Sequence, residues 1–117
     1  TILKVDIEGD EYKLLKVINK EVNRINMLII EFHRIRQNLS KIKKFLLENK
    51  FKIIHIHGNN FGGIDKNGNP NVMEVTFINP RKFKVSKHKS NFKYPIPGLD
   101  FRNFKRANDI ILNFDDR

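Results

Sequence analysis

The alternation of apolar and polar residues at the start of the chain predicts a strand that runs directly into a helix. Leu3, Val5 and Ile7 alternate with polar residues, which is the period of a strand whose two faces meet different surroundings. Over residues 14–22 the apolar residues recur instead at helical spacing. Gly9 lies between the two patterns, where the backbone must turn sharply.

A second strand and a second helix are predicted to follow. Residues 27–32 form an apolar run without alternation, as expected for a strand that is covered on both faces. Two strands that a helix joins within about thirty residues form a right-handed unit in which the strands are parallel. Asn38 or Ser40 can cap the next helix, which carries Ile42 and Phe45 on its apolar face.

The remaining pattern predicts a hairpin rather than another crossover. Residues 51–57 and 72–78 read as strands, and the segment 58–70 between them is a loop rich in glycine and asparagine. Because that loop is short and has no helical pattern, an antiparallel pair is favoured. The chain is less regular after Pro80, and residues 109–114 predict a short strand or an extended packing segment. The fold class is therefore α/β, with parallel strands and helical crossovers that end in an antiparallel hairpin.

Three successive strands end in polar residues. These pairs are Asp6 and Glu8, Glu31 and His33, and His57 and Asn59. In open α/β sheets, ligands bind at the carboxyl ends of the strands. We therefore expect the three pairs to share one rim of the sheet, and this convergence is the strongest indication of a site in the sequence.

Composition indicates one domain with one modest core. The chain has 117 residues, of which 39% are hydrophobic and 31% are charged. We expect residues 1–80 to form the core and residues 81–117 to form a basic tail packed on the same domain. The absence of cysteine excludes disulfides and thiolate metal sites. The sequence shows neither a long apolar run nor a secretory signal, so we expect a cytoplasmic location and no membrane partner.

The net charge of +10 is concentrated in two basic stretches, residues 34–52 and 81–93. Such stretches attract polyanions, so a nucleic-acid or polyanion binding module is an alternative function. Solvated lysine faces explain the charge more simply, and nucleic acid is not the expected partner. The aromatic residues that would stack on bases are spread out, as in a small core, and are Phe83, Phe92, Tyr94, Phe101 and Phe104.

The polar rim also contains residue types that bind metal ions. Imidazole and carboxylate groups suit zinc or manganese, and His55 and His57 project from one face of their strand. No compact ligand motif is present, so we predict no resident metal and keep a metal site as the less favoured alternative. Residues 65–69 begin like a calcium loop, but Thr76 stands where the bidentate glutamate belongs, and a turn is expected.

The opening stretch resembles a family signature. Lys4-Val5-Asp6-Ile7-Glu8-Gly9-x-Glu11 is similar to the K-x-D-x-E-G-x-E signature of FkbM-type methyltransferases, which use S-adenosylmethionine. Further stretches are similar, in order and spacing, to one bacterial branch of FkbM-like proteins: Ile30 to His33, His55 to Asn60, Glu74 to Phe77 and Gly98 to Asn103. The glycine-rich G-x-G turn, which in this fold holds the methionine and ribose parts of the cofactor, is absent from the sequence.

The resemblance implies the carboxyl-terminal half of a Rossmann-like methyltransferase fold. In a complete enzyme it implies methyl transfer to a hydroxyl group of a sugar or another small-molecule acceptor. The chain alone is expected to bind S-adenosylmethionine poorly or not at all and to be inactive. The implied catalytic residues are Asp6, Glu8 and His33, and Asp6 and Glu8 would also lie near the sulfonium of the cofactor. The implied substrate-binding residues are His57, Asn59 and Asn60.

A third hypothesis concerns the edge of the sheet. The chain starts at Thr1, inside the signature and without a methionine, which predicts a piece excised from a longer protein. A sheet cut at its first strand exposes a hydrogen-bonding edge, and such an edge invites strand addition and a homodimer.

Overall fold

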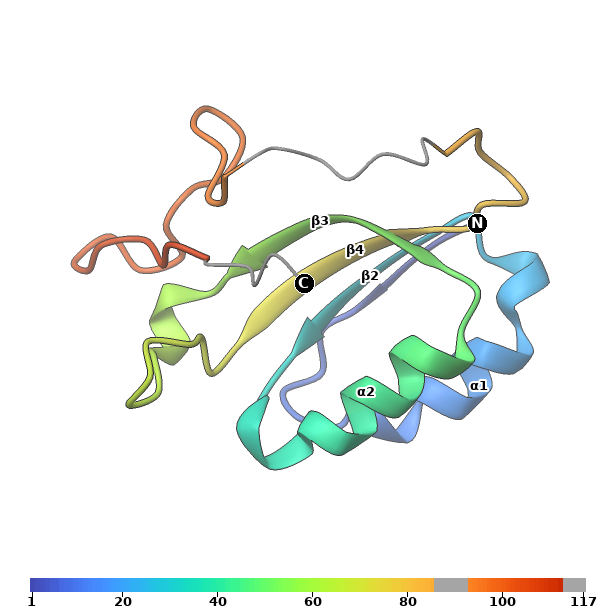
Figure 1. Ribbon diagram of the computed structural model, residues 1–117, viewed down its shortest axis with the longest axis horizontal. Helices are drawn as coiled ribbons and strands as arrows, with labels where there is room; N and C mark the ends of the chain where they lie inside the picture. Colours follow the sequence, from blue (N-terminus) through green and yellow to red (C-terminus); the bar gives the residue numbers. More distant parts are fainter. Residues whose placement is uncertain (86–92, 113–117) are drawn as a thin grey trace.

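The computed structural model describes residues 1–85 and 93–112, in which the main element is a mixed four-stranded sheet of order β1-β2-β4-β3. Its strands are Ile2–Val5 (β1), Met27–Phe32 (β2), Lys52–Gly58 (β3) and Met73–Ile78 (β4). The predicted parallel pair is confirmed for β1 and β2, and the predicted antiparallel hairpin is confirmed for β3 and β4. Strand β4 lies between β2 and β3 and is antiparallel to both (Figure 1).

Two helices pack side by side on one face of this sheet (Figure 1). They are α1 (Leu15–Lys20) and α2 (Leu39–Glu48), and short 3₁₀ turns precede or follow them at Glu11–Lys13, Val22–Arg24 and Arg36–Asn38. The first helix is shorter than its apolar pattern because the backbone tightens at Glu21, whose N–H bonds to the carbonyls of both Val17 and Ile18. Asn38 does stand at the N-terminus of α2, but its side chain donates to the Arg34 carbonyl at 3.0 Å and does not cap the helix.

The hydrophobic core lies between the helices and the sheet. Leu28, Ile30 and Phe32 of β2 are almost fully buried, as is Phe77 of β4, and Phe45 of α2 packs edge-on against Phe77. The intervening β2 residues are half-buried on the opposite face. The prediction that β2 is covered on both faces is therefore wrong, because the helices cover only one face of the sheet. An apolar residue on the other face need not be fully buried.

The face of the sheet opposite the helices, here called the open face, carries polar side chains from all four strands. Register places Glu31, Glu74 and His57 in one row across β2, β4 and β3, and Lys4 of β1 makes an ion pair with Glu74 at 3.5 Å. Part of the C-terminal segment, residues 93–112, lies over this face beside β3 (Figure 1). The polar residues predicted at the strand ends thus lie on a surface that the helices do not cover.

The C-terminal segment meets the sheet through a few buried residues. Ile110 is 7% exposed and lies against Gly58 at the end of β3. Leu112 pairs with Tyr94 in an isolated antiparallel bridge, so the extended segment predicted for residues 109–114 is present at Leu112, while residues 113 and 114 lie outside the described part. Within residues 1–85 and 93–112, none of the helices has the length and apolar character that crossing a bilayer requires.

Candidate functional site

Both parallel strands end in a left-handed backbone turn. After β1, Glu8 has a φ of 55° and Gly9 a φ of 105°, and after β2, Arg34 has a φ of 47°. Residues other than glycine adopt this conformation rarely, at a cost of roughly 1–3 kcal/mol. The two turns bring the segments that leave β1 and β2 together around His33, so the strain is located at the predicted rim.

Glu11 holds His33 in place from inside the protein. It is fully buried, and its Oε1 atom accepts a hydrogen bond from the His33 backbone N–H at 2.6 Å and lies 3.2 Å from the ring atom Nδ1. Its Oε2 atom accepts from the Gly9 N–H at 2.8 Å, and the Tyr12 hydroxyl donates to the His33 carbonyl. Because a carboxylate only accepts, Nδ1 carries the proton in this contact and Nε2 points the other way. In the sequence, Glu11 is only the last residue of the family signature, and nothing there connects it with His33.

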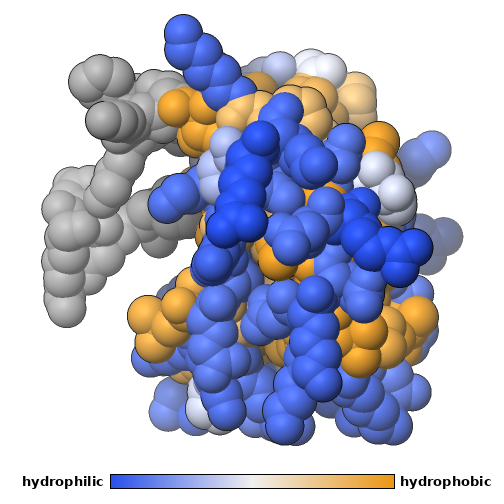
Figure 2. Space-filling view, turned by 90° about the vertical axis from the view of Figure 1, so that its right-hand side faces the viewer, coloured by the Kyte–Doolittle hydropathy of each residue, from blue (hydrophilic) through white to orange (hydrophobic). Residues whose placement is uncertain are grey.

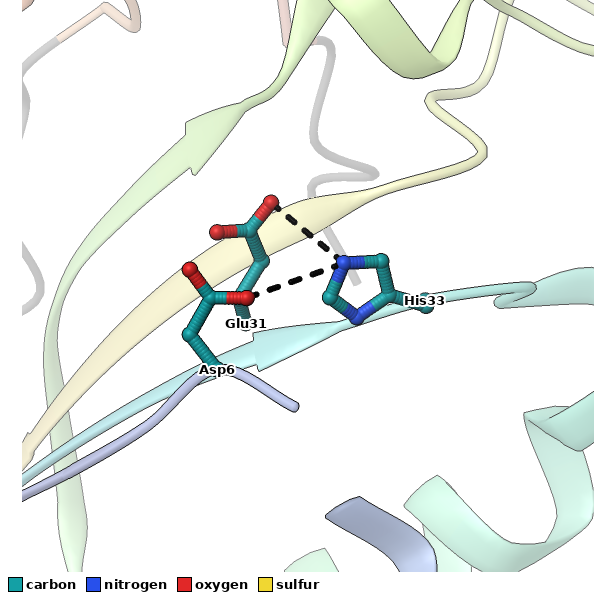
Figure 3. A group of neighbouring side chains, drawn as sticks. All are labelled: Asp6, Glu31 and His33. Carbon is teal, nitrogen blue, oxygen red and sulfur yellow. Dashed lines mark ion pairs between the residues drawn. The ribbon is translucent and has the colours of Figure 1, made fainter. Parts of the chain in front are cut away.

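The Nε2 atom of His33 faces three other carboxylates. Glu31 Oε1 and Glu8 Oε2 are each 3.7 Å away, and Asp6 Oδ1 is 3.8 Å away. Figure 3 shows Asp6 and Glu31 directed at the same side of the imidazole ring. The His33 and Glu31 side chains are 12% and 13% exposed, whereas that of Glu8 is 88% exposed. We call Asp6, Glu8, Glu31 and His33 the histidine rim; three of its members are those we predicted to be catalytic.

Glu31 connects the predicted pair Glu31 and His33 with the predicted pair His57 and Asn59. Asn59 donates from Nδ2 to Glu31 Oε1 at 2.7 Å, and its own Oδ1 accepts from the Phe61 N–H at 3.0 Å. Burial raises the pKa of the Glu31 carboxyl and the nearby Asp6 charge raises it further, while the hydrogen bond from Asn59 opposes the shift. A positive charge near the Glu31 carboxylate would therefore be favourable.

A hollow of about 350 Å³ opens beside His33. Its polar lining includes Arg34, Gln37 and Asn71, none of which we predicted from the sequence, and Glu8 also reaches it. Gly62 is required for its shape, because a Cβ there would lie 2.5 Å from Val72 Cγ2. In the sequence, two features could have indicated these lining residues. They are the position of Arg34 next to His33 and the glycine- and asparagine-rich composition of the loop.

The remaining predicted substrate residues do not lie at this hollow. Asn60 is buried and donates to the backbone carbonyls of Phe104 and Ala107 at 2.9 and 3.1 Å, and its Oδ1 accepts from the Phe104 N–H at 2.7 Å. His57 Nε2 lies 3.1 Å from Asp109 Oδ2. Of the three predicted substrate-binding residues, only Asn59 contacts the histidine rim. The substrate roles of all three stay predictions.

Two histidine–aspartate contacts tie the C-terminal segment to β3. His55 Nε2 lies 2.9 Å from Asp100 Oδ1, whose side chain is 4% exposed, and the His55 ring packs against Tyr94 with centroids 5.4 Å apart. We call His55, His57, Asp100 and Asp109 the tail clasp. The same-face placement of the two histidines was predicted, but their aspartate partners were not.

Comparison with known proteins adds no assignment to this geometry. The chain matches none of the protein-family models, curated proteins or solved structures with which it was compared.

Proposed function

We propose that this chain forms the acceptor-side half of an S-adenosylmethionine-dependent methyltransferase of the FkbM-like type, which methylates a hydroxyl group of a sugar or another small acceptor. One observation carries the proposal. Asp6, Glu31 and His33 converge at the carboxyl ends of adjacent parallel strands, beside a polar hollow. Asp6 and His33 are two of the three residues that the family resemblance connects with the reaction, and Glu31 joins them in the structure.

The arrangement of the strands also supports the proposal. The resemblance implies parallel strands followed by an antiparallel hairpin, and β1, β2, β3 and β4 are arranged in this way. The 117 residues contain no glycine-rich G-x-G turn, so the methionine and ribose parts of the cofactor would be held by residues that this sequence does not supply.

The reaction requires little covalent chemistry from the protein. S-adenosylmethionine, where bound, would supply the methyl group to the acceptor oxygen and leave as a neutral thioether, and the protein would hold the acceptor oxygen in line with the carbon–sulfur bond. The acceptor loses its proton to a base, for which His33 Nε2 and Asp6 are the candidates. Glu11 would stabilise a protonated His33 through Nδ1 at 3.2 Å. The exposed carboxylates of the rim complement the positive sulfonium before transfer.

The hollow beside His33 suits a polar acceptor better than an apolar one. Gln37 and Asn71 supply amide groups that can bond to hydroxyls, and Arg34 supplies a positive charge for a phosphate or carboxylate on the acceptor. Asn59 retains its predicted role near the acceptor through its bond to Glu31.

The test is methyl transfer from S-adenosylmethionine labelled in the methyl group to a panel of sugars and other small hydroxyl compounds. The gene product that contains these residues is assayed beside the 117-residue chain, and each is titrated calorimetrically with S-adenosylmethionine. We expect transfer by the longer protein and little or no cofactor binding by the chain alone. Failure of both to bind the cofactor would contradict the proposal and favour a binding module.

Substitutions in the longer protein separate catalytic from structural roles. Asp6→Ala or His33→Ala is expected to lower turnover at least about 100-fold, the scale of a lost general base, while the melting temperature falls much less. The matched control is Asp109→Asn in the tail clasp, which leaves the rim intact. Equal losses of turnover and stability in the rim variants would indicate structural roles.

The free edge of β1 supports a second candidate function, self-association. Within the described residues β1 pairs only with β2, and Ile2 is 68% exposed. A hollow of about 240 Å³ beside this strand is lined partly by Leu3, Val17 and Ile25. Figure 2, which views the molecule from the right-hand side of Figure 1, shows hydrophilic side chains over most of that face with apolar patches between them.

We propose that a second copy pairs with this edge by strand addition. Size-exclusion chromatography with light scattering should show a dimer, and Val17→Glu at the hollow should convert it to a monomer. A wild-type monomer at all accessible concentrations would contradict self-association.

A further inference from the structure

We propose that the histidine rim binds one divalent transition-metal cation, Zn²⁺ or Mn²⁺, through His33 Nε2, Asp6 Oδ1 and Glu31 Oε1. These three residues offer ligand atoms that all lie within 4.8 Å of one another. From the sequence, a metal site is the less favoured alternative, because the ligands come from two strands and form no compact motif. The fold brings Asp6, Glu31 and His33 together although Asp6 lies far from the other two in the sequence.

The distances fit ligands that share a cation better than groups bonded to each other. Nε2 lies 3.8 Å from Asp6 Oδ1 and 3.7 Å from Glu31 Oε1, both too long for hydrogen bonds. Two ligands that are each about 2.1 Å from one cation lie up to about 4.2 Å apart. A single ion between Nε2 and the two carboxylates would therefore be within reach of all three, and Figure 3 shows Asp6 and Glu31 both directed at this nitrogen.

The tail clasp shows what an imidazole does when it pairs directly with a carboxylate. His55 and His57 approach Asp100 and Asp109 to 2.9 and 3.1 Å, with one aspartate for each ring. No single carboxylate approaches His33 Nε2 to such a distance. His33 instead lies at nearly equal, longer distances from several carboxylates, which is the arrangement of a coordination site.

The groups behind the rim orient it as outer ligands of a metal site do. Nδ1 of His33 is 3.2 Å from the buried Glu11 carboxylate, so the Nε2 lone pair is directed at Asp6 and Glu31. Without a proton or cation, that lone pair would face only other lone pairs. Asn59 fixes Glu31 by a 2.7 Å hydrogen bond. Glu11 is fully buried and Asn59 is half-buried, and their hydrogen bonds hold the ligands in place without a cation.

The chemistry of the ligands indicates the class of cation. One imidazole with two carboxylates suits zinc or manganese, whereas Mg²⁺ and Ca²⁺ prefer sites made only of oxygen ligands. The rim also concentrates negative charge in a chain of net charge +10, which favours a cation here over the rest of the surface. Glu8, whose Oε2 atom is 3.7 Å from Nε2 and largely exposed, is positioned to serve as a further ligand or to remain free.

The cation site stands independently of the proposed methyl transfer. Only one consequence rests on that proposed function: an acceptor hydroxyl bound to the cation would lose its proton more readily, and Glu8 would then replace His33 as the proton acceptor.

The test is a calorimetric titration of the 117-residue chain, first treated with chelator, with ZnCl₂ and separately with MnCl₂. No cofactor or acceptor is present, so the result does not depend on methyl transfer. We expect one Zn²⁺ per chain and weaker binding of Mn²⁺. Asp6→Asn keeps the shape of a side chain that is 40% exposed, and should weaken Zn²⁺ binding at least about 10-fold. His33→Gln should weaken it by about 100-fold or more.

The matched control is Asp109→Asn, which removes a carboxylate beside a histidine in the tail clasp and should leave the Zn²⁺ affinity unchanged. Absence of stoichiometric binding to the wild-type chain would overturn the proposal. So would equal affinity of the wild-type chain and the folded Asp6→Asn variant, or loss of binding in the control, because the ion would then lie elsewhere. Circular dichroism of each variant establishes that it is folded.

Discussion

Two groups of histidines and carboxylates share the open face of one sheet and differ in how they are arranged. In the tail clasp, His55 and His57 each contact one aspartate at 2.9 and 3.1 Å. In the histidine rim, His33 Nε2 faces three carboxylates, the nearest at 3.7 Å. The first arrangement is that of paired groups that hold a segment in place, and the second is that of groups arranged around a ligand.

Burial sharpens this contrast. Asp100 and Asp109 are 4% and 14% exposed at the side chain and have their partners within contact distance. The rim combines a well-buried Glu31 with the exposed Glu8, and a hollow opens beside it. Residue types alone would make the two groups look alike. Their distances and access to solvent indicate that one anchors structure and the other is available for chemistry.

The largest expected effect on stability comes from Glu11, the buried residue that holds His33 of the rim and contacts no residue of the tail clasp. Glu11→Ala leaves the His33 N–H and the Gly9 N–H without their buried acceptor, so the free energy of unfolding should fall by roughly 3 kcal/mol. Urea denaturation measures the change. Glu21→Ala is the control, since its ion pair with Arg24 is exposed and should contribute almost nothing. Equal stabilities of the two variants would show that Glu11 does not organise the rim.

The tail clasp should give an intermediate effect. Asp100 contacts His55 and accepts a hydrogen bond from the Ile96 N–H at 2.7 Å, so Asp100→Ala should cost about 1–2 kcal/mol. We expect proteases to cut the C-terminal segment of this variant sooner while the sheet remains folded, and Zn²⁺ affinity to stay at the wild-type level. A parallel loss of zinc binding would mean that clasp and rim are not separate units.

The smallest effect on stability should follow a change in the rim itself. In metal-free protein, Asp6→Asn removes one of several carboxylates that repel each other, and its 3.8 Å contact with His33 Nε2 is too long for a hydrogen bond, so stability should change by no more than about 0.5 kcal/mol. Thermal unfolding in chelator measures this. A large loss of stability would show that Asp6 is a structural partner of His33. The histidine rim would then not differ from the tail clasp in its role.

The sequence was sufficient to predict the strands because their patterns are local. Runs of apolar residues defined β2 and β4, and the short glycine-rich loop indicated the hairpin that the structure confirms. The meeting of Asp6 with Glu31 and His33 was also predictable, since carboxyl ends of adjacent parallel strands share an edge. What could not be predicted was which face the helices leave open, because apolar residues such as Ile29 fit a half-exposed position as well as a buried one.

The contacts that set the roles of single residues were beyond the sequence. Glu11 resembles an ordinary residue of a first helical turn, and only the left-handed turn at Glu8 and Gly9 directs its carboxylate to His33, 22 residues later. His57 and Asp109 are 52 residues apart, with no pattern that connects them. Spacing along the chain carries little information about such pairs, because the intervening segment is irregular.

The most direct test of the central claim compares the imidazole rings in one sample. Long-range ¹H–¹⁵N NMR spectra of the 117-residue chain, recorded as Zn²⁺ is added to one equivalent, report each histidine ring nitrogen separately. We predict that Nε2 of His33 changes to the chemical shift of a metal-bound nitrogen, while the ring nitrogens of His55 and His57 keep their shifts. Unchanged His33 signals, or metal-dependent shifts at His55 or His57 instead, would contradict the division of this face into a ligand site and a structural clasp.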